Sequence, residues 1–182
     1  MEGINKSNRH SIRLKSFDYT SENIFFVTIC SSNQEEIFGK VDNGSISLTA
    51  LGIVIDRRWQ RIVHDFENVA LLNYVIMPNH LHGLIHLNYR ATTRVAPTLG
   101  QVIGSFKSKC VKDWLCYIKE RDIAWYGKIW QRNYFEHIVR NSTSYDRIND
   151  YIEDNQRMWC QNKLEIIFRN NSGRPQGSPL QN

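Results

Sequence analysis

The stretch from Val75 to Leu87 constrains the fold more than any other part of the chain. Two apolar runs flank Pro78-Asn79, a pair typical of tight turns, and a His-x-His pair (His80 and His82) follows directly. Two strands joined by so short a turn pair antiparallel. Because side chains alternate faces along a strand, the two imidazoles point the same way, roughly 6.5–7 Å apart.

These histidines allow two interpretations. Two imidazoles on one strand face can bind a divalent metal, provided that further ligands come from other elements. The same pattern is equally typical of a half-buried strand whose polar residues face solvent. His86 shares the face of His80 and His82, and a surface or core role is favoured for it. The pair alone leaves both interpretations open.

Hydrophobic periodicity predicts the remaining elements. We expect strands over 24–30, 69–77, 80–87 and 134–139, helices over 50–66, 98–119 and 143–160, and an inserted hairpin over about 36–48. The first six main elements follow the order of a split βαβ arrangement. The predicted fold class is therefore α+β: a ferredoxin-like βαββαβ antiparallel sheet with helices on one face, plus a C-terminal helix. The histidine strand would lie at or beside the sheet centre.

Length and composition predict one globular domain over residues 1–168. The chain has 182 residues, of which 41% are hydrophobic and 12% aromatic, and this suits a folded protein. No apolar run approaches the roughly 20 residues of a membrane helix, and the N-terminus lacks an apolar signal segment. We therefore expect a cytoplasmic protein without membrane contact. Residues 169–182 are rich in Asn, Gly, Pro and Gln and are predicted to be a disordered tail.

The charge balance favours an acidic partner. The formal net charge is +5, which places nucleic acid first among candidate partners. Residues 1–22 are basic and polar, and they are interpreted equally well as an arm on a phosphate backbone or as a frayed terminus. The four cysteines are scattered without a Cys-x-x-Cys pair, which argues against a structural zinc site and a disulfide framework.

Two later segments carry further candidate chemistry. The segment 130–137 combines cations with aromatic rings that could contact single-stranded nucleic acid, although an amphipathic strand has the same pattern. In the last helix Tyr151 and Asn155 are four residues apart and therefore share a face. Taken alone, a tyrosine beside an apolar stripe is more typical of a core than of a nucleophile.

Four segments in order resemble a known family. They are Met77–Gly83 (MPNHLHG), Gly104–Ser108 (GSFKS), Trp130–His137 (WQRNYFEH) and Tyr151 with Asn155. This set resembles the REP-associated tyrosine transposases, relatives of the single-tyrosine HUH transposases of the smallest insertion sequences. The resemblance covers roughly residues 9–160. It departs from the family once, because relatives commonly have Asn-Pro where this chain has Asn155-Gln156, a change that lets the helix continue.

The resemblance implies a role for each matching residue. Tyr151 would be the nucleophile, and His80, His82 and Asn155 would hold Mg²⁺ or Mn²⁺. The substrate would be single-stranded DNA near repeat hairpins, cleaved through a 5′-phosphotyrosine link and rejoined by a monomer or homodimer. The candidates for phosphate contacts are the cations Lys107, Lys109, Arg132 and Arg140.

Two other functions remain open. The first is a domesticated DNA-binding protein that has lost cleavage, which the presence of Tyr151 and all three metal candidates disfavours. The second is an unrelated ferredoxin-like nucleic-acid hydrolase with zinc on His80, His82 and His86, in which Tyr151 would be dispensable.

Overall fold

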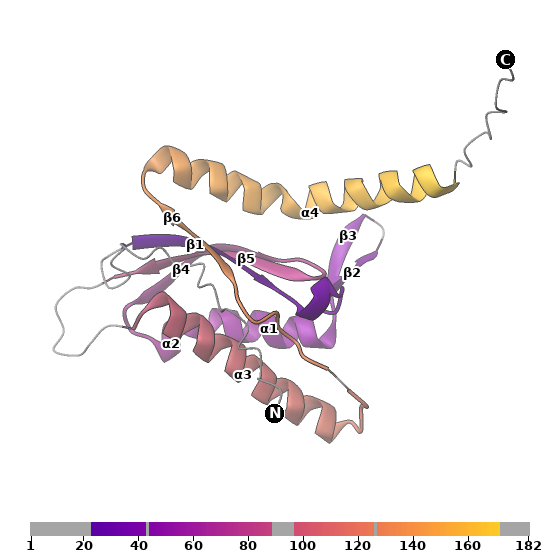
Figure 1. Cartoon of the computed structure of the whole chain (residues 1–182), viewed down its shortest axis with the longest axis horizontal. Coiled ribbons are helices and arrows are strands. Elements are labelled where there is room, and N and C mark those ends of the chain that lie inside the picture. Colours follow the sequence, from indigo (N-terminus) through magenta and orange to yellow (C-terminus); the bar gives the residue numbers. More distant parts are fainter. Residues whose placement is uncertain (1–22, 43, 89–96, 126, 172–182) are drawn as a thin grey trace, which may run out of the picture.

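A single four-stranded sheet organises the molecule. The computed structural model describes residues 23–42, 44–88, 97–125 and 127–171, with the backbone alone for 163–171. The strands lie in the order β4 (Val69–Ile76), β5 (His80–Leu87), β1 (Asn23–Cys30) and β6 (Phe135–Val139). Every neighbouring pair is antiparallel, so the predicted ferredoxin-like arrangement is confirmed and the histidine strand is central (Figure 1). The predicted basic arm over residues 1–22 lies outside the described residues.

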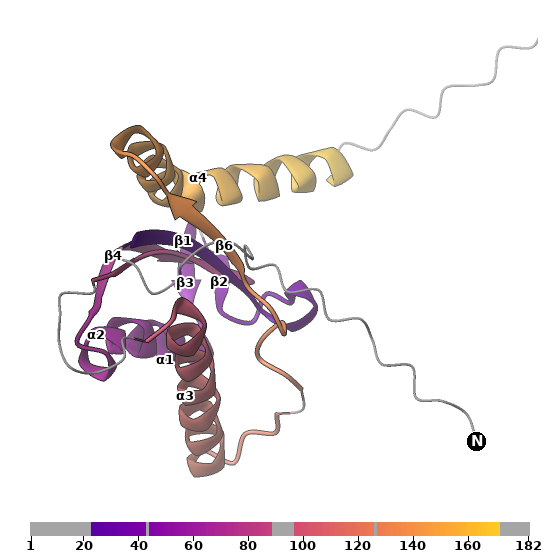
Figure 2. The ribbon, with the colours of Figure 1, turned by 60° about the vertical axis from the view of Figure 1, so that its left-hand side comes forward.

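Helices cover both faces of this sheet. The helices α1 (Ala50–Gln60), α2 (Ile62–Asp65) and α3 (Leu99–Glu120) lie on one side, and α4 (Ser142–Asn171) lies on the other (Figures 1 and 2). Local capping defines where α1 and α3 begin. Thr49 accepts a hydrogen bond from the backbone N–H of Gly52, and Thr98 forms a reciprocal capping box with Gln101.

Two predicted helix boundaries were wrong. The helix expected over 50–66 is divided at Arg61, whose ψ of −6° departs from helical geometry and separates α1 from α2. The last helix, expected to end at 160, continues to Asn171. No Gly or Pro interrupts residues 142–171, so nothing in the local sequence stops it earlier. Residues 169–171, assigned above to a tail, are its last residues, and 172–182 lie outside the described part.

The main core lies between the sheet and α1 with α3. Alternate residues of β1 and β5 point into it, among them Phe25, Val27, Ile29, Leu81 and Ile85, all fully buried. Gly83 explains the close contact between this sheet face and α1. A Cβ atom at Gly83 would lie 2.3 Å from Cζ2 of Trp59, so glycine is the residue that lets the buried indole rest on the strand.

A smaller core lies on the opposite face, beneath α4. Its buried members are Val75, Met77, Leu84, Val139 and Ile152. The first four come from the sheet and the turn that follows β4, and Ile152 comes from α4. This cluster attaches the helix to the sheet and leaves the neighbouring face of β5 for polar side chains.

The predicted hairpin forms a separate two-stranded sheet of β2 (Gly39–Asp42) and β3 (Ser45–Leu48). It is tied to the turn between β4 and β5, because Phe38 N–H donates to the Pro78 carbonyl at 2.9 Å.

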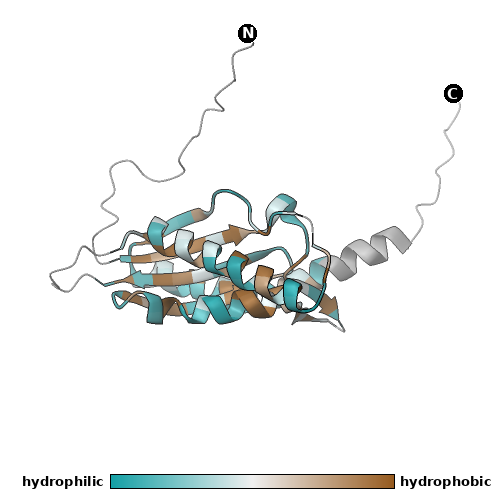
Figure 3. Ribbon diagram, turned by 90° about the horizontal axis from the view of Figure 1, so that it is seen from below, coloured by the Kyte–Doolittle hydropathy of each residue, from teal (hydrophilic) through white to brown (hydrophobic). Residues whose placement is uncertain are grey.

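On the helical layer, hydrophilic and hydrophobic residues alternate along the chain, whereas the strands behind carry hydrophobic stretches (Figure 3). None of the described helices combines the length and apolarity needed to cross a membrane.

Candidate active site

Two histidines lie together on the face of β5 that is turned toward α4. The ring centroids of His80 and His82 are 4.5 Å apart. His82 is buried, and His80 is half-buried. The predicted common orientation of the two imidazoles is therefore confirmed by the structure.

Hydrogen bonds orient both imidazoles. His80 Nδ1 lies 2.7 Å from Oδ1 of Asn79, and because an amide oxygen only accepts, the Nδ1–H donates. His82 Nδ1 lies 2.8 Å from Oγ1 of Thr28, its direct partner across β1 and β5. The Tyr151 hydroxyl lies 3.2 Å from His82 Nε2. Both partners of His82 are hydroxyls, which can donate or accept, so either tautomer of His82 satisfies these two contacts. His80, with its proton on Nδ1, keeps its lone pair on Nε2.

Burial keeps both imidazoles neutral. Desolvation lowers the pKa of His80 to about 4. Desolvation, with a smaller effect from the neighbouring His80, lowers the pKa of His82 to about 3. Phe26 stacks on the His82 ring at a centroid distance of 5.2 Å and closes that side to water. Neutral imidazoles with a free Nε2 are the form that binds metal ions.

Helix α4 supplies the second half of the site. Tyr151 is 44% exposed, so its hydroxyl reaches His82 while remaining open to solvent. Trp159, two turns further along, contacts the ring of His80 with centroids 5.6 Å apart. Asn155 lies between these two contacts and is buried, with 7% exposure. The spacing of four residues therefore places Asn155 on the helix face that covers the histidine pair.

The side chains that could bind a metal here offer both nitrogen and oxygen donors, which suits a divalent cation that accepts both. The donors are Nε2 of His80, Nε2 of His82 and the side-chain oxygen of Asn155. Within the described part of the chain, no three or more His, Cys, Asp or Glu side chains gather to hold a metal ion. A zinc site of His80, His82 and His86 is therefore not formed by these residues, although His86 lies on the same strand face.

The four predicted phosphate-binding cations lie in different places. Lys107, on α3, donates its ammonium to the carbonyls of Gln131 and Asn133 at 2.9 and 3.0 Å. Burial lowers the pKa of Lys107 to about 8. Lys109, also on α3, pairs with Asp65 at 2.7 Å.

Arg132 and Arg140 are both exposed. Arg132 lies in the segment that leads into β6, and Arg140 directly follows that strand. The structure brings none of the four cations into the cluster around His82. DNA contact stays a prediction for each of them.

Sequence reasoning missed two residues that orient the histidines, Thr28 and Asn79. Thr28 was visible only as a hydroxyl within an apolar strand, and its pairing with His82 depends on the register between β1 and β5. Asn79 was interpreted as a turn residue, and its side chain also accepts from His80.

The chain is similar to several known proteins. The family model described as "Transposase IS200 like" matches residues 55–155. An uncharacterized protein of Haemophilus influenzae is 37% identical over 174 residues, which cover 87% of this chain and 93% of that protein. Among solved structures, a REP-associated tyrosine transposase bound to a REP hairpin is similar, with a TM-score of 0.49 and 17% identity over 79% of this chain and 72% of that one.

Proposed function

The chain belongs to the family of IS200-like transposases, and from this premise we propose that it cleaves and rejoins single-stranded DNA with Tyr151 as its nucleophile. The observation that carries the proposal is the hydrogen bond between the Tyr151 hydroxyl and His82, beside a second neutral imidazole, that of His80.

The reaction needs only the tyrosine oxygen and the DNA backbone as bonding partners. The phenol oxygen of Tyr151 attacks the scissile phosphorus, and the bond from phosphorus to the 3′ oxygen breaks. The phenol proton passes to water, since the side chain is 44% exposed, and the leaving oxygen takes a proton to become a 3′-OH. The products are a 5′-phosphotyrosine and a free 3′-OH. Attack by the same or another 3′-OH reverses the step without ATP.

His80, His82 and Asn155 are the proposed ligands of a divalent cation, Mg²⁺ or Mn²⁺. When bound, that cation polarises a non-bridging oxygen of the scissile phosphate as a Lewis acid. Asn79 and Thr28 occupy Nδ1 of His80 and of His82, so Nε2 is the nitrogen by which each ring would hold the cation. Imidazole nitrogen is a softer ligand than oxygen and favours Mn²⁺ over Mg²⁺.

The hydroxyl of Tyr151 and a cation compete for one lone pair. In the tautomer that a cation requires, His82 Nε2 has a single lone pair, and that lone pair accepts the proton of the Tyr151 hydroxyl 3.2 Å away. Tyr151 therefore has to turn away from His82 when the nitrogen acts as a ligand. Its 44% exposure allows this rotation.

The proposed substrate is a single strand near a repeat hairpin, as the sequence resemblance implies. Phe135 supports a single strand on this face, because it is 54% exposed and lies opposite Thr28 in the β1–β6 register. A base stacked there would lie in the same row as His82. Arg132 and Arg140 are the proposed exposed phosphate contacts. The chain would act as a monomer or homodimer in the cytoplasm.

The test is covalent capture of labelled single-stranded hairpin DNA with Mn²⁺ or Mg²⁺. On a denaturing gel the wild-type protein should form a protein–DNA adduct that disappears in Tyr151→Phe. Tyr134→Phe is the matched control, because Tyr134 is a half-buried tyrosine packed against the main core. An adduct that survives Tyr151→Phe would identify another nucleophile.

The same experiment addresses the domesticated alternative. Tight, specific binding without an adduct under either metal would support a DNA-binding protein that no longer cleaves. Cleavage without any adduct, unaffected by Tyr151→Phe, would instead support a hydrolase that activates water.

A further inference from the structure

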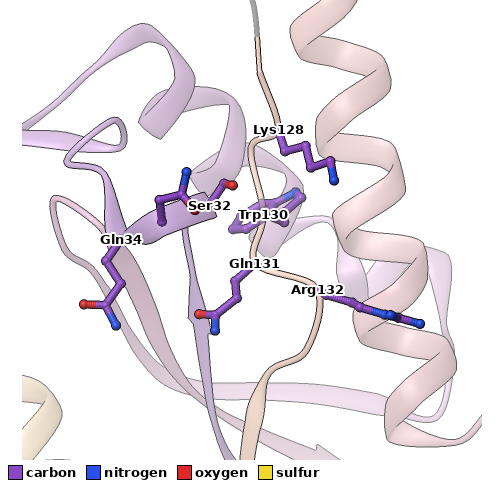
Figure 4. A pocket seen from close by; sticks show the side chains of 7 residues that line it. Ser32, Gln34, Lys128, Trp130, Gln131 and Arg132 are labelled. Atoms are coloured by element: carbon purple, nitrogen blue, oxygen red, sulfur yellow. The ribbon is translucent and has the colours of Figure 1, made fainter. Parts of the chain in front are cut away.

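A hollow of about 660 Å³ lies at the end of β1 (Figure 4). One wall is the short helix η1 (Ser32–Gln34), and the other is the segment 128–132 that leads toward β6. The volume is in the range of small-ligand sites. The sequence motif 130–137 thus forms part of a concave surface in addition to an edge strand.

Backbone hydrogen bonds hold both walls of the hollow in place. Ser32 N–H donates to the Ile129 carbonyl at 2.9 Å, and Gln131 N–H donates to the Cys30 carbonyl at 3.0 Å. Lys107 fixes the outer wall from α3 through the carbonyls of Gln131 and Asn133. The hollow is therefore a preformed site, although its walls contain little regular secondary structure.

The lining separates cations from amides. Lys128 and Arg132 lie on the side nearer α3, whereas Gln34 and Gln131 extend on the other side (Figure 4). No carboxylate is among the lining side chains. Trp130 forms part of the lining and is backed by Phe38 and Phe106, at centroid distances of 5.1 and 5.6 Å.

This division matches the two parts of a nucleotide. Cations attract the phosphate without reading its base, while an amide can donate to and accept from a base edge. An unpaired nucleotide exposes both parts at once, whereas a duplex hides its base edges within the grooves.

Asn79 connects the hollow to the metal-binding candidates. Its side-chain N–H₂ donates to the Gln34 carbonyl at 3.1 Å, and its Oδ1 accepts from His80 Nδ1 at 2.7 Å. One side chain therefore spans the distance from the wall of the hollow to His80. A nucleotide in the hollow would lie close to the scissile phosphate along the same strand.

We propose that this hollow binds one unpaired nucleotide next to the cleavage position, with Lys128 and Arg132 on its phosphates and Gln34 and Gln131 at its base edge. The inference rests on the proposed single-strand function. It adds a specificity site, lined by residues 32–34 and 128–132, outside the cluster around His82.

The first experiment measures binding of a labelled single strand by fluorescence anisotropy at several salt concentrations. Lys128→Ala and Arg132→Ala should each reduce the slope of log affinity against log salt by about 0.7, the value for one phosphate contact on a single strand. The control is Arg57→Ala, an exposed cation on α1 that does not line the hollow, and it should leave the slope unchanged. Equal losses on single-stranded and duplex DNA would overturn the assignment to an unpaired nucleotide.

The second experiment tests base reading. Bound strands are selected from a pool of random single strands and sequenced. The wild-type protein should enrich one base at one position, and Gln131→Ala should lose that enrichment while retaining the salt slope. Retained enrichment in Gln131→Ala, or none in the wild type, would overturn base reading in the hollow. Thermal unfolding of each variant confirms that it remains folded.

These outcomes separate the hollow from the proposed chemistry. If the wild-type protein forms the Tyr151 adduct but the hollow variants bind as the wild type does, nucleotide binding in the hollow is refuted and the cleavage proposal is supported. If the slopes and enrichment change as expected but no adduct forms, nucleotide binding in the hollow is supported and the cleavage proposal is refuted.

Discussion

The two faces of strand β5 differ in purpose although their residues alternate along one segment. Leu81, Ile85 and Leu87 point into the main core beneath α1 and α3 and are fully buried. His80 and His82 point the other way, toward α4, where Tyr151 contacts His82. The first face is sealed by apolar packing alone, whereas the second combines a smaller apolar core, which includes Leu84, with hydrogen-bonded imidazoles and an exposed tyrosine. Adjacent residues of β5 therefore serve the stability of the core and the chemistry of the candidate site, respectively.

A pair of neighbouring substitutions should break this comparison most strongly. Leu81→Ala removes a fully buried side chain from the main core and should lower the free energy of unfolding by about 2–5 kcal/mol. His82→Ala should abolish the DNA adduct and leave the protein folded, because the ring that it removes stacks on Phe26 beside the smaller core and lies outside the main core. Denaturant unfolding and the adduct gel measure the two effects. The comparison fails if Leu81→Ala is neutral or if His82→Ala unfolds the protein.

Gly83 offers the next largest effect, again on the core face. In Gly83→Ala the new methyl group would meet the Trp59 indole at 2.3 Å, and overpacking of this kind costs about 1–3 kcal/mol. Combining it with Trp59→Phe should give less destabilisation than the sum of the two single changes, because the smaller ring leaves room for the methyl group. Denaturant unfolding of all four proteins completes the cycle, and additive effects would contradict a direct clash.

On the polar face the effect should appear in metal affinity. Thr28→Val removes the hydroxyl that orients His82 while keeping the shape of the side chain. Loss of such an outer partner weakens metal binding about 10- to 100-fold, as measured by titration calorimetry with Mn²⁺. Thr28→Ser should restore most of the affinity. Unchanged affinity in Thr28→Val would show that the Thr28 hydroxyl does not orient His82 for a cation.

The same comparison explains what the sequence could predict. The order of elements predicted the ferredoxin-like sheet, because each main element carries its own hydrophobic periodicity. The strand period of two predicted that His80 and His82 share a face. Both inferences need only local information about one segment at a time.

What could not be predicted depends on contacts between distant segments. Thr28 meets His82 across a strand register that no local pattern encodes. Lys107 reads in the sequence as a cation on a helix, and only the path of residues 128–134 shows that its ammonium donates to two backbone carbonyls. The role of Tyr151 as nucleophile came from the family resemblance, since its own surroundings in the sequence favoured a core residue.

The smallest expected effect concerns the competition for His82 Nε2. In Tyr151→Phe the lone pair no longer accepts a hydroxyl proton, so binding a cation breaks no hydrogen bond. A hydrogen bond of this kind contributes about 0.5–1.5 kcal/mol, and Mn²⁺ affinity should therefore rise about 2- to 10-fold. Calorimetry on the DNA-free protein measures this change independently of cleavage, and Tyr134→Phe should leave the affinity unchanged. Weaker binding in Tyr151→Phe would mean that the hydroxyl assists the cation, and the two would then share the site.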